Sequence, residues 1–287
     1  MAPKVAIDLP YCGRFAPTPS GPLHFGSLVA AVASYLDAQA HCGKWLVRIE
    51  DVDQPRAVAG ADSIILRQLE AFGLHWDGEV MYQSQRDEAY RIALQQLQAQ
   101  HLCYYCTCTR KQIKARGPYY TGYCRDKQRN AENAAIRILN DRPIANFYDR
   151  WQGEVNIEPN FAAEDFVLFR RDQLYTYQLA VVVDDIAQGV TDLVRGVDLL
   201  TPTAWQLTLW QQFEARQPRL MHVPLALDVN GRKLSKQNHA PALNAKEPKE
   251  QLARAIAFLG LGEVDTGNDI QQLLAEASQA WAAKYLS

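Results

Sequence analysis

The sequence predicts an α/β fold, and three local patterns support this prediction. A loop rich in proline and glycine, residues 13–27, leads into an apolar run that begins at Ser27 and is typical of a buried helix. Residues 45–49 read as a short apolar strand that is followed by carboxylates. Over residues 60–73, apolar side chains recur at helical spacing until Gly73 stops the pattern. Strands and helices that alternate in this way indicate a sheet covered by helices.

The loop at residues 13–27 reads GRFAPTPSGPLHFGS and has the composition of an anion-binding segment. Its three prolines and three glycines keep the backbone out of regular structure. Free N–H groups and the positive end of the helix dipole therefore meet where the helix begins, and a phosphate or carboxylate is a natural ligand there. His24, close to Gly26, can donate a hydrogen bond to it. Taken alone, the loop favours the simpler interpretation, a proline- and glycine-rich entry into a core helix.

Length and composition restrict the kind of protein. With 287 residues, 48% of them hydrophobic, the chain can bury a large core and hold more than one folding unit. No apolar run approaches the length that crosses a bilayer, and the first ten residues lack the regions of a signal peptide. We therefore expect a cytoplasmic protein with no membrane partner. The net charge of −2 argues against indiscriminate nucleic-acid binding, and we expect no DNA partner.

Three carboxylates, Glu50, Asp51 and Asp53, follow the strand at residues 45–49. The carboxyl ends of strands are where open α/β sheets bind ligands, so these side chains suit an amine, a ribose or a metal. A solvated acidic turn is the alternative.

A basic segment lies between Arg110 and Arg129, with seven basic residues and one acid. Tyr119, Tyr120 and Tyr123 lie among them. Cations that meet phosphates and rings that stack on bases suit a nucleic-acid strand. A solvated face would have the same composition, and the sequence leaves both interpretations open.

Four of the six cysteines fall within the same part of the chain. In a reducing compartment such a cluster favours a metal site over disulfides. Chemistry alone predicts that Zn²⁺ would be bound by the four thiolates of Cys103, Cys106, Cys108 and Cys124. Four protein ligands leave no open position, so the metal would be structural.

The later part of the chain holds three more candidate groups. Tyr177, in the run YTYQLAVVVDD, reads by itself as a half-buried strand tyrosine. Arg195 lies at the carboxyl end of an expected strand, where a guanidinium can bind a carboxylate through two hydrogen bonds. Residues 231–237, GRKLSKQ, form a basic loop in which Lys233 and Lys236 can surround a triphosphate.

The remaining elements are expected from local patterns. A helix should begin at Ser84, where Ser-Gln-Arg-Asp forms a capping box. Residues 146–154 read as a strand and a turn, and residues 166–185 as two strands running into a helix. Two amphipathic helices should follow the basic loop, one ending near Leu259 and one over residues 268–286.

These segments together resemble the glutamate-specific class I aminoacyl-tRNA synthetases. RFAPTPSGPLHFGS resembles their ATP-binding signature, with His24-Phe25-Gly26-Ser27 at the "HIGH" position; RIEDVD resembles their RIEDTD box, and GRKLSKQ their KMSKS loop. The resemblance runs from about residue 13 to residue 236. It implies a Rossmann-like parallel sheet with a zinc-bearing insertion and a short C-terminal helical region.

The resemblance also implies roles for individual residues. Arg14 and Arg195 would bind the two carboxylates of L-glutamate, and Glu50 its α-amino group. Catalysis would rest on His24, Lys233 and Lys236, through charge in the transition state. The implied ATP-binding residues are His24, Gly26, Ser27, Lys233 and Lys236. The implied glutamate-binding residues are Arg14, Phe15, Ala16, Pro17, Thr18, Glu50, Tyr177 and Arg195.

The family's zinc arrangement, C-x-C followed by Y-x-x-x-C, maps onto Cys106, Cys108, Tyr120 and Cys124. By this resemblance Tyr120 replaces Cys103, which stays a competing fourth ligand. A Mg²⁺ ion is expected with ATP.

The resemblance divides the chain at residues 1–85, 86–165, 166–239 and 240–287, with the insertion as the second part and the C-terminal helices as the last. Glutamyl-tRNA synthetases carry a further helical portion that reaches the anticodon, whereas here residues 237–287 alone follow Lys236. We therefore expect a truncated relative that forms glutamyl-adenylate and transfers glutamate to queuosine in the anticodon loop of tRNA(Asp). The alternatives are charging of the acceptor end of tRNA(Glu), a non-catalytic tRNA-binding protein, and an unrelated nucleotidyl transferase.

Overall fold

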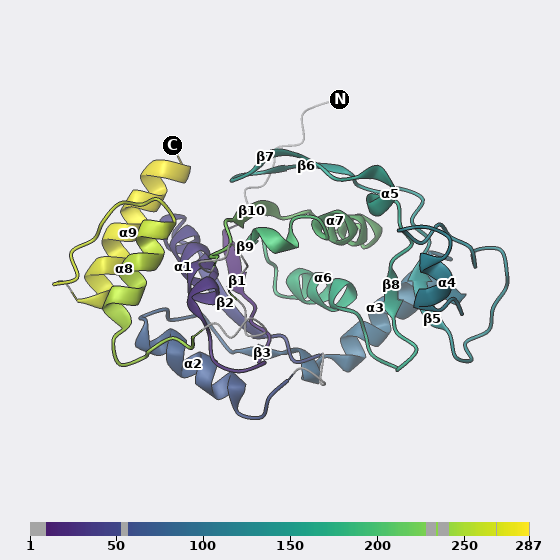
Figure 1. Cartoon of the computed structure of the whole chain (residues 1–287), viewed down its shortest axis with the longest axis horizontal. Coiled ribbons are helices and arrows are strands. Elements are labelled where there is room, and N and C mark those ends of the chain that lie inside the picture. The colour runs from purple at the N-terminus through teal and green to yellow at the C-terminus, as the bar shows by residue number, and fades with distance from the viewer. Residues whose placement is uncertain (1–9, 53–56, 228–233, 235–240, 268, 287) are drawn as a thin grey trace.

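A parallel β-sheet forms the centre of the molecule (Figure 1). The computed structural model describes residues 10–52, 57–227, 234, 241–267 and 269–286. The parallel strands are β1 (Cys12–Phe15), β2 (Lys44–Ile49), β3 (Met81–Tyr82), β9 (Asp192–Gly196) and β10 (Arg219–Val223). They pair in the orders β1-β2-β3 and β9-β10. The backbone N–H of Thr191 donates to the carbonyl of Cys12 at 2.8 Å, which sets β9 beside β1. The predicted α/β fold with a parallel sheet is confirmed.

Helix α1 (Phe25–Ala40) is deeply buried beside this sheet. Leucine, valine and alanine on nearly every side of it are shielded from water because it lies between the sheet and the pair α8 (Pro248–Phe258) and α9 (Ile270–Tyr285). The helix begins at Phe25, two residues before the predicted start at Ser27. Helix α2 (Ala61–Ala71), α8 and α9 lie where the sequence predicts helices.

Asp37, a fully buried carboxylate on α1, connects four parts of the chain. Tyr11 donates its hydroxyl proton to Asp37 at 2.6 Å, the Trp281 indole N–H donates at 2.9 Å, and the Arg150 guanidinium donates from Nη1 at 3.0 Å. A carboxylate buried without partners would cost several kcal/mol, so these donors are needed together. They fix the C-terminal helix α9 to the helix that follows the proline- and glycine-rich loop.

The segment between β3 and β9 builds most of the other end of the molecule, opposite α8 and α9 (Figure 1). Its strands form the antiparallel sheet β4-β5-β8 and the hairpin β6-β7. The bounds are β4 (Cys103–Cys106), β5 (Ala135–Ile138), β6 (Asn146–Asp149), β7 (Gly153–Asn156), β8 (Val167–Phe169), the 3₁₀ turn Gln83–Gln85 and the helices α3 (Asp87–Ala99), α4 (Arg110–Lys114) and α5 (Pro159–Ala162).

The predicted helix start at Ser84 is wrong by three residues. Ser84 does not cap α3; instead its backbone N–H and its hydroxyl donate to Asp51 at 2.7 and 2.6 Å. A long-range carboxylate thus takes the place of the local capping box, and residues 83–85 form a 3₁₀ turn before the helix.

Two helices lie beside the end of the sheet where β9 and β10 are found. They are α6 (Tyr177–Ala187) and α7 (Thr203–Gln212), and the 3₁₀ turn Val197–Leu199 precedes α7. Of the two strands predicted before α6, one is present as β8, while Tyr175 makes only an isolated bridge to Phe169. Tyr177 is the first residue of α6 and not a strand residue. In the described part of the chain no helix is both long and apolar enough to span a bilayer.

Candidate active site and metal centre

A cavity of about 680 Å³ opens at the carboxyl ends of β1 and β9 and at the start of α1. The parallel strands place the side chains at their carboxyl ends on one edge, as expected for an open α/β sheet. The cavity brings together most residues that the sequence predicts for ATP and glutamate. Those that line it are Arg14, Phe15, Ala16, Pro17, Thr18, His24, Gly26, Ser27, Tyr177 and Arg195. Lys233 and Lys236 lie outside the described residues.

Glu50 lines a smaller adjoining cavity of about 230 Å³. Thr18 and Tyr177 line both cavities and form the wall between them. The Glu50 carboxylate accepts a hydrogen bond from Arg48 at 3.3 Å. Burial raises the pKa of Glu50, although Arg48 and Arg14 act in the opposite direction. Burial, reinforced by Glu50, also raises the pKa of the Tyr177 hydroxyl to about 12, so this hydroxyl keeps its proton at neutral pH.

Arg14, at 3% exposure, is held against a carboxylate. Its Nε and Nη2 donate to the two oxygens of Asp185 at 3.0 and 3.4 Å. Asp185 also accepts from Arg48 at 2.8 Å. Burial alone would raise the pKa of Asp185, but the two guanidiniums outweigh burial and lower it. Arg14 therefore lines the cavity with a counter-ion already in contact.

Arg195, at 5% exposure, has a different environment. Its Nε donates to the imidazole of His222 at 3.0 Å, and its Nη2 donates to Thr203 at 2.8 Å and to Gln206 at 2.6 Å. Its Nη1 has no hydrogen-bond partner within the described residues. Burial lowers the pKa of this guanidinium. Every direct partner of Arg195 in the described chain is a neutral group, so its charge is available to an anion.

The start of α1 forms the third wall of the cavity. His24 is the N-cap residue, and its Nδ1 accepts the backbone N–H of Ser27 at 3.2 Å. A β-carbon at Gly26 would lie 3.1 Å from the His24 ring, so glycine allows the imidazole to lie against the backbone. Leu234, which also lines the cavity, is joined to Ala226 by a 2.9 Å backbone hydrogen bond. The positive end of the helix dipole thus faces the cavity.

Sequence reasoning gave no role to Arg48, Asp149 or His222, all fully buried charged or titratable groups. One signal was present for Arg48, because an arginine inside the apolar strand WLVRI must find a buried partner. Its charged partners are Glu50, Asp184 and Asp185. No local pattern marks the pair Asp149 and His222, since the two residues are distant in sequence and meet only through the fold.

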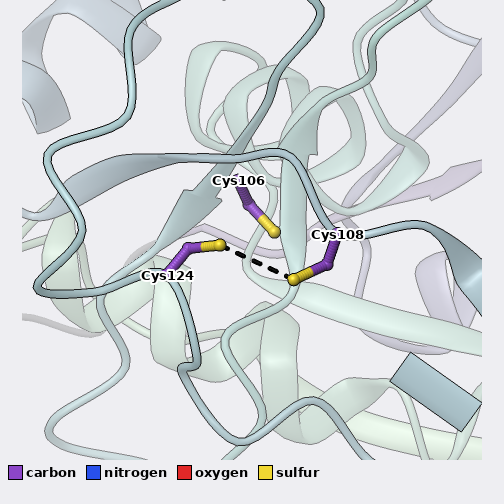
Figure 2. Close-up of side chains that lie close together, drawn as sticks. All are labelled: Cys106, Cys108 and Cys124. Atoms are coloured by element: carbon purple, nitrogen blue, oxygen red, sulfur yellow. Dashed lines mark hydrogen bonds between the residues drawn. The ribbon is translucent and has the colours of Figure 1, made fainter. Parts of the chain in front are cut away.

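Three of the four clustered cysteines meet at one point in the insertion. Figure 2 shows the side chains of Cys106, Cys108 and Cys124 converging, and their sulfur atoms lie within 4.8 Å of one another. The sulfurs of Cys108 and Cys124 are 3.6 Å apart. Zn–S bonds of about 2.3 Å in a tetrahedron place sulfurs roughly 3.8 Å apart, so this spacing fits a zinc ion. Burial acts against ionisation, but hydrogen bonds from the Thr107 backbone and other groups lower the pKa of Cys124 to about 7.

Of the two candidates for a fourth ligand, Tyr120 lies beside these sulfurs and Cys103 does not. The Tyr120 hydroxyl lies 3.4 Å from the Cys106 sulfur and accepts the backbone N–H of Cys124 at 2.9 Å. Cys103 is not part of the sulfur cluster. Its thiol is largely buried, which raises its pKa to about 12 and keeps it protonated.

Comparison with known proteins defines the class. Residues 12–265 match the family model for the catalytic domain of class I tRNA synthetases (E and Q). The chain belongs to this family, and the family predicted from the sequence motifs is confirmed.

Similar relatives specify the kind of synthetase further. The chain is 54% identical over 277 residues to the glutamyl-Q tRNA(Asp) synthetase of Idiomarina loihiensis, covering 96% of this chain and 98% of that protein. It is also 54% identical over 276 residues to the glutamyl-Q tRNA(Asp) synthetase of Salmonella typhi, covering 96% of this chain and 93% of that protein.

A solved structure shares the fold. The glutamate-tRNA synthetase of Elizabethkingia anophelis superposes with a TM-score of 0.77 at 25% identity. The match covers 94% of this chain but 65% of that enzyme, so the chain spans about two thirds of its length.

Proposed function

We propose that this protein activates L-glutamate with ATP to form glutamyl-adenylate and transfers the glutamate to the queuosine nucleoside in the anticodon loop of tRNA(Asp). The name carried by its relatives at 54% identity supports this activity over the alternatives. The observation that carries the proposal is the cavity in which two buried arginines, Arg14 and Arg195, lie with the start of helix α1.

The groups around the cavity suit the two ends of glutamate. Two guanidiniums can bind two carboxylates, and the carboxylate of Glu50, across the wall of Thr18 and Tyr177, can accept the α-ammonium group. We assign Phe15, Ala16 and Pro17 to the shape of this binding site.

ATP would bind where α1 begins. The positive end of the helix dipole at Gly26 and Ser27 favours phosphate, and His24 lies at the same point. A carboxylate oxygen of glutamate attacks the α-phosphorus, a new P–O bond forms, and the bond to pyrophosphate breaks. Lys233 and Lys236 are proposed to stabilise the charge on that leaving group, and Mg²⁺ bound with ATP would screen the phosphates.

In the second step a hydroxyl of the queuosine cyclopentene ring attacks the mixed anhydride and releases AMP. Arg14, Arg195 and Tyr177 hold the glutamate during both steps, so the acyl carbon stays in place while the nucleophile changes. We also propose that the chain consists of four parts, with boundaries after residues 85, 165 and 239.

We also propose a structural Zn²⁺ ion held by Cys106, Cys108, Cys124 and Tyr120. The sulfur spacing and the position of the tyrosine hydroxyl support this ligand set. The ion would join the segment after β4 to the chain near Cys124, far from the cavity residues in sequence.

The test has two stages. The purified protein is first assayed for ATP–pyrophosphate exchange that depends on glutamate. It is then incubated with ATP, labelled glutamate and tRNA(Asp) with or without queuosine, or with tRNA(Glu), and the label is located after nuclease digestion. We expect label in the anticodon-loop fragment of queuosine-containing tRNA(Asp). Label on a terminal adenosine would favour tRNA charging, and absence of exchange would reject adenylate formation.

A further inference from the structure

A buried chain of hydrogen bonds leads from the β6-β7 hairpin to Arg195. Asp149, the last residue of β6, lies 2.6 Å from Nδ1 of His222 on β10. Nε2 of His222 lies 3.0 Å from Nε of Arg195 on β9. Asp149 and His222 have no exposed surface. Neither residue lines the cavity.

The proton positions in this chain follow from the donors. Arg195 Nε always carries hydrogen, so Nε2 of His222 must accept. The imidazole proton is therefore on Nδ1, which donates to Asp149, and the ring is neutral. Burial and the neighbouring Arg195 lower the pKa of His222, in agreement with a neutral ring.

The other carboxylate oxygen of Asp149 also has hydrogen-bond partners. Its Oδ1 accepts three backbone N–H groups, from Trp151 at 3.0 Å, Gln152 at 2.9 Å and His222 at 3.1 Å. These hydrogen bonds fix the orientation of the carboxylate, so that Oδ2 alone faces the imidazole.

We propose that Asp149 and His222 are positioning residues for substrate binding: they hold the Arg195 guanidinium through a neutral acceptor and so leave its charge for a glutamate carboxylate. This inference rests on the proposed function. The contrast with Arg14, which contacts the carboxylate of Asp185, supports it. A direct carboxylate partner at Arg195 would orient the group equally well but would compete with the substrate for its charge.

The hydrogen-bonded chain Asp149–His222–Arg195 is called the relay below. Asp149→Asn tests this relay without removing the backbone hydrogen bonds to residue 149. Because Oδ1 must keep accepting three N–H groups, the asparagine oxygen takes that position and its NH₂ group faces His222 Nδ1. The imidazole must then place its proton on Nε2, where it meets the N–H of Arg195. Nε2 can then donate to Thr203 Oγ1, 3.1 Å away, but it no longer accepts from Arg195, so the guanidinium loses the hydrogen bond that orients it.

We expect Asp149→Asn to raise the KM for glutamate at least about tenfold in ATP–pyrophosphate exchange, the loss of one hydrogen bond to a charged group. The KM for ATP should change less than about twofold. Asp165→Asn, which changes a fully buried carboxylate of the insertion, is the matched control and should leave the KM for glutamate near the wild-type value.

His222→Gln keeps an acceptor for Arg195, because the glutamine Oε1 can occupy the place of Nε2. This variant should stay within about threefold of the wild-type KM for glutamate, whereas His222→Asn, with its shorter side chain, should show the larger increase of Asp149→Asn. In the double variant with His222→Gln, Asp149→Asn should have little further effect, because no imidazole tautomer remains to be changed.

The outcomes separate the two proposals. If wild-type protein shows no glutamate-dependent exchange, the proposed function fails and the relay is rejected with it. The relay is rejected, and the function stands, if the wild type is active but Asp149→Asn and His222→Asn raise the KM for glutamate and the KM for ATP by the same factor. The same holds if these variants change neither KM. Thermal unfolding of each variant is recorded, since a glutamate-specific change in a folded variant is a result that a purely structural role would not give.

Discussion

Replacing Arg195 by lysine keeps the positive charge but removes the planar fork. The arginine makes three hydrogen bonds through Nε and Nη2, to His222, Thr203 and Gln206, while Nη1 has no partner among the described residues. A lysine has one ammonium group at the end of a flexible chain, which cannot occupy these positions at the same time. The substituted cation is therefore less well placed toward a carboxylate in the cavity.

The size of the effect follows from the hydrogen bonds that lysine cannot make. Arginine can donate to a carboxylate from two nitrogens and lysine from one, and a hydrogen bond to a charged group contributes about 1.5–3 kcal/mol. At about 1.4 kcal/mol for each factor of ten, the KM for glutamate should rise roughly 10- to 100-fold. The KM for ATP should remain close to that of the wild type.

The assay is ATP–pyrophosphate exchange over a range of glutamate concentrations. Arg150→Lys is the control, because Arg150 is a largely buried arginine that pairs with Asp37 outside the cavity. It should lower the free energy of unfolding without a glutamate-specific effect. An unchanged glutamate requirement in Arg195→Lys would remove Arg195 from substrate binding and would refute the assignment.

Three further predictions concern the metal, the buried carboxylate of α1 and the basic segment. Cys124→Ser should abolish zinc binding and lower the thermal midpoint, measured by metal analysis and calorimetry, while Cys42→Ser, at an exposed isolated thiol, should do neither. Asp37→Asn should cost about 3 kcal/mol of unfolding free energy at pH 7. Folding lowers the pKa of Asp37 below 3.8, so this stabilisation is present above pH 3.8 and is lost as the pH falls through the lowered pKa. Urea denaturation at decreasing pH should therefore show the unfolding free energies of the variant and the wild type converging. Replacing the exposed Lys111 and Lys114 by alanine should weaken tRNA binding and reduce the slope of log affinity against log salt by about 0.7–0.9 for each phosphate that is no longer neutralised; an unchanged slope would make this segment a solvated face.

Local patterns in the sequence were sufficient to predict the main elements that surround the cavity. The proline- and glycine-rich loop leads into an apolar helix, and the apolar strand before Glu50 is followed by carboxylates. The parallel arrangement of the strands then brings their polar ends to one edge of the sheet. Arg14 and Arg195 were grouped through the resemblance to the synthetase family, and the fold places both on the cavity.

The errors occur where a distant partner outweighs a local signal. Ser84 has a capping-box pattern, but its hydroxyl and its backbone N–H donate to the carboxylate of Asp51 instead. Cys103, which ligand chemistry alone favoured and the family resemblance did not, lies in β4 with its thiol outside the cluster of the other three sulfurs. Neither competition can be read from a sequence window, because each depends on which segments the fold places together.

The two arginines of the cavity differ in the charge of the groups that they contact. Arg14 shares Asp185 with Arg48, and Arg48 also pairs with Glu50 and with Asp184, which pairs with Arg86. Three guanidiniums and three carboxylates therefore form a nearly neutral, largely buried cluster. Arg195 has only uncharged direct partners in the described chain. A ligand with two carboxylates and one ammonium group carries one net negative charge, which would compensate Arg195 once its ammonium is near Glu50. Glutamine has no net charge, and its amide would leave this buried guanidinium without a counter-ion. Because a buried uncompensated charge is far more costly than the absence of one neutral hydrogen bond, the preference for an acidic amino acid follows from the neutrality of the groups that hold Arg195.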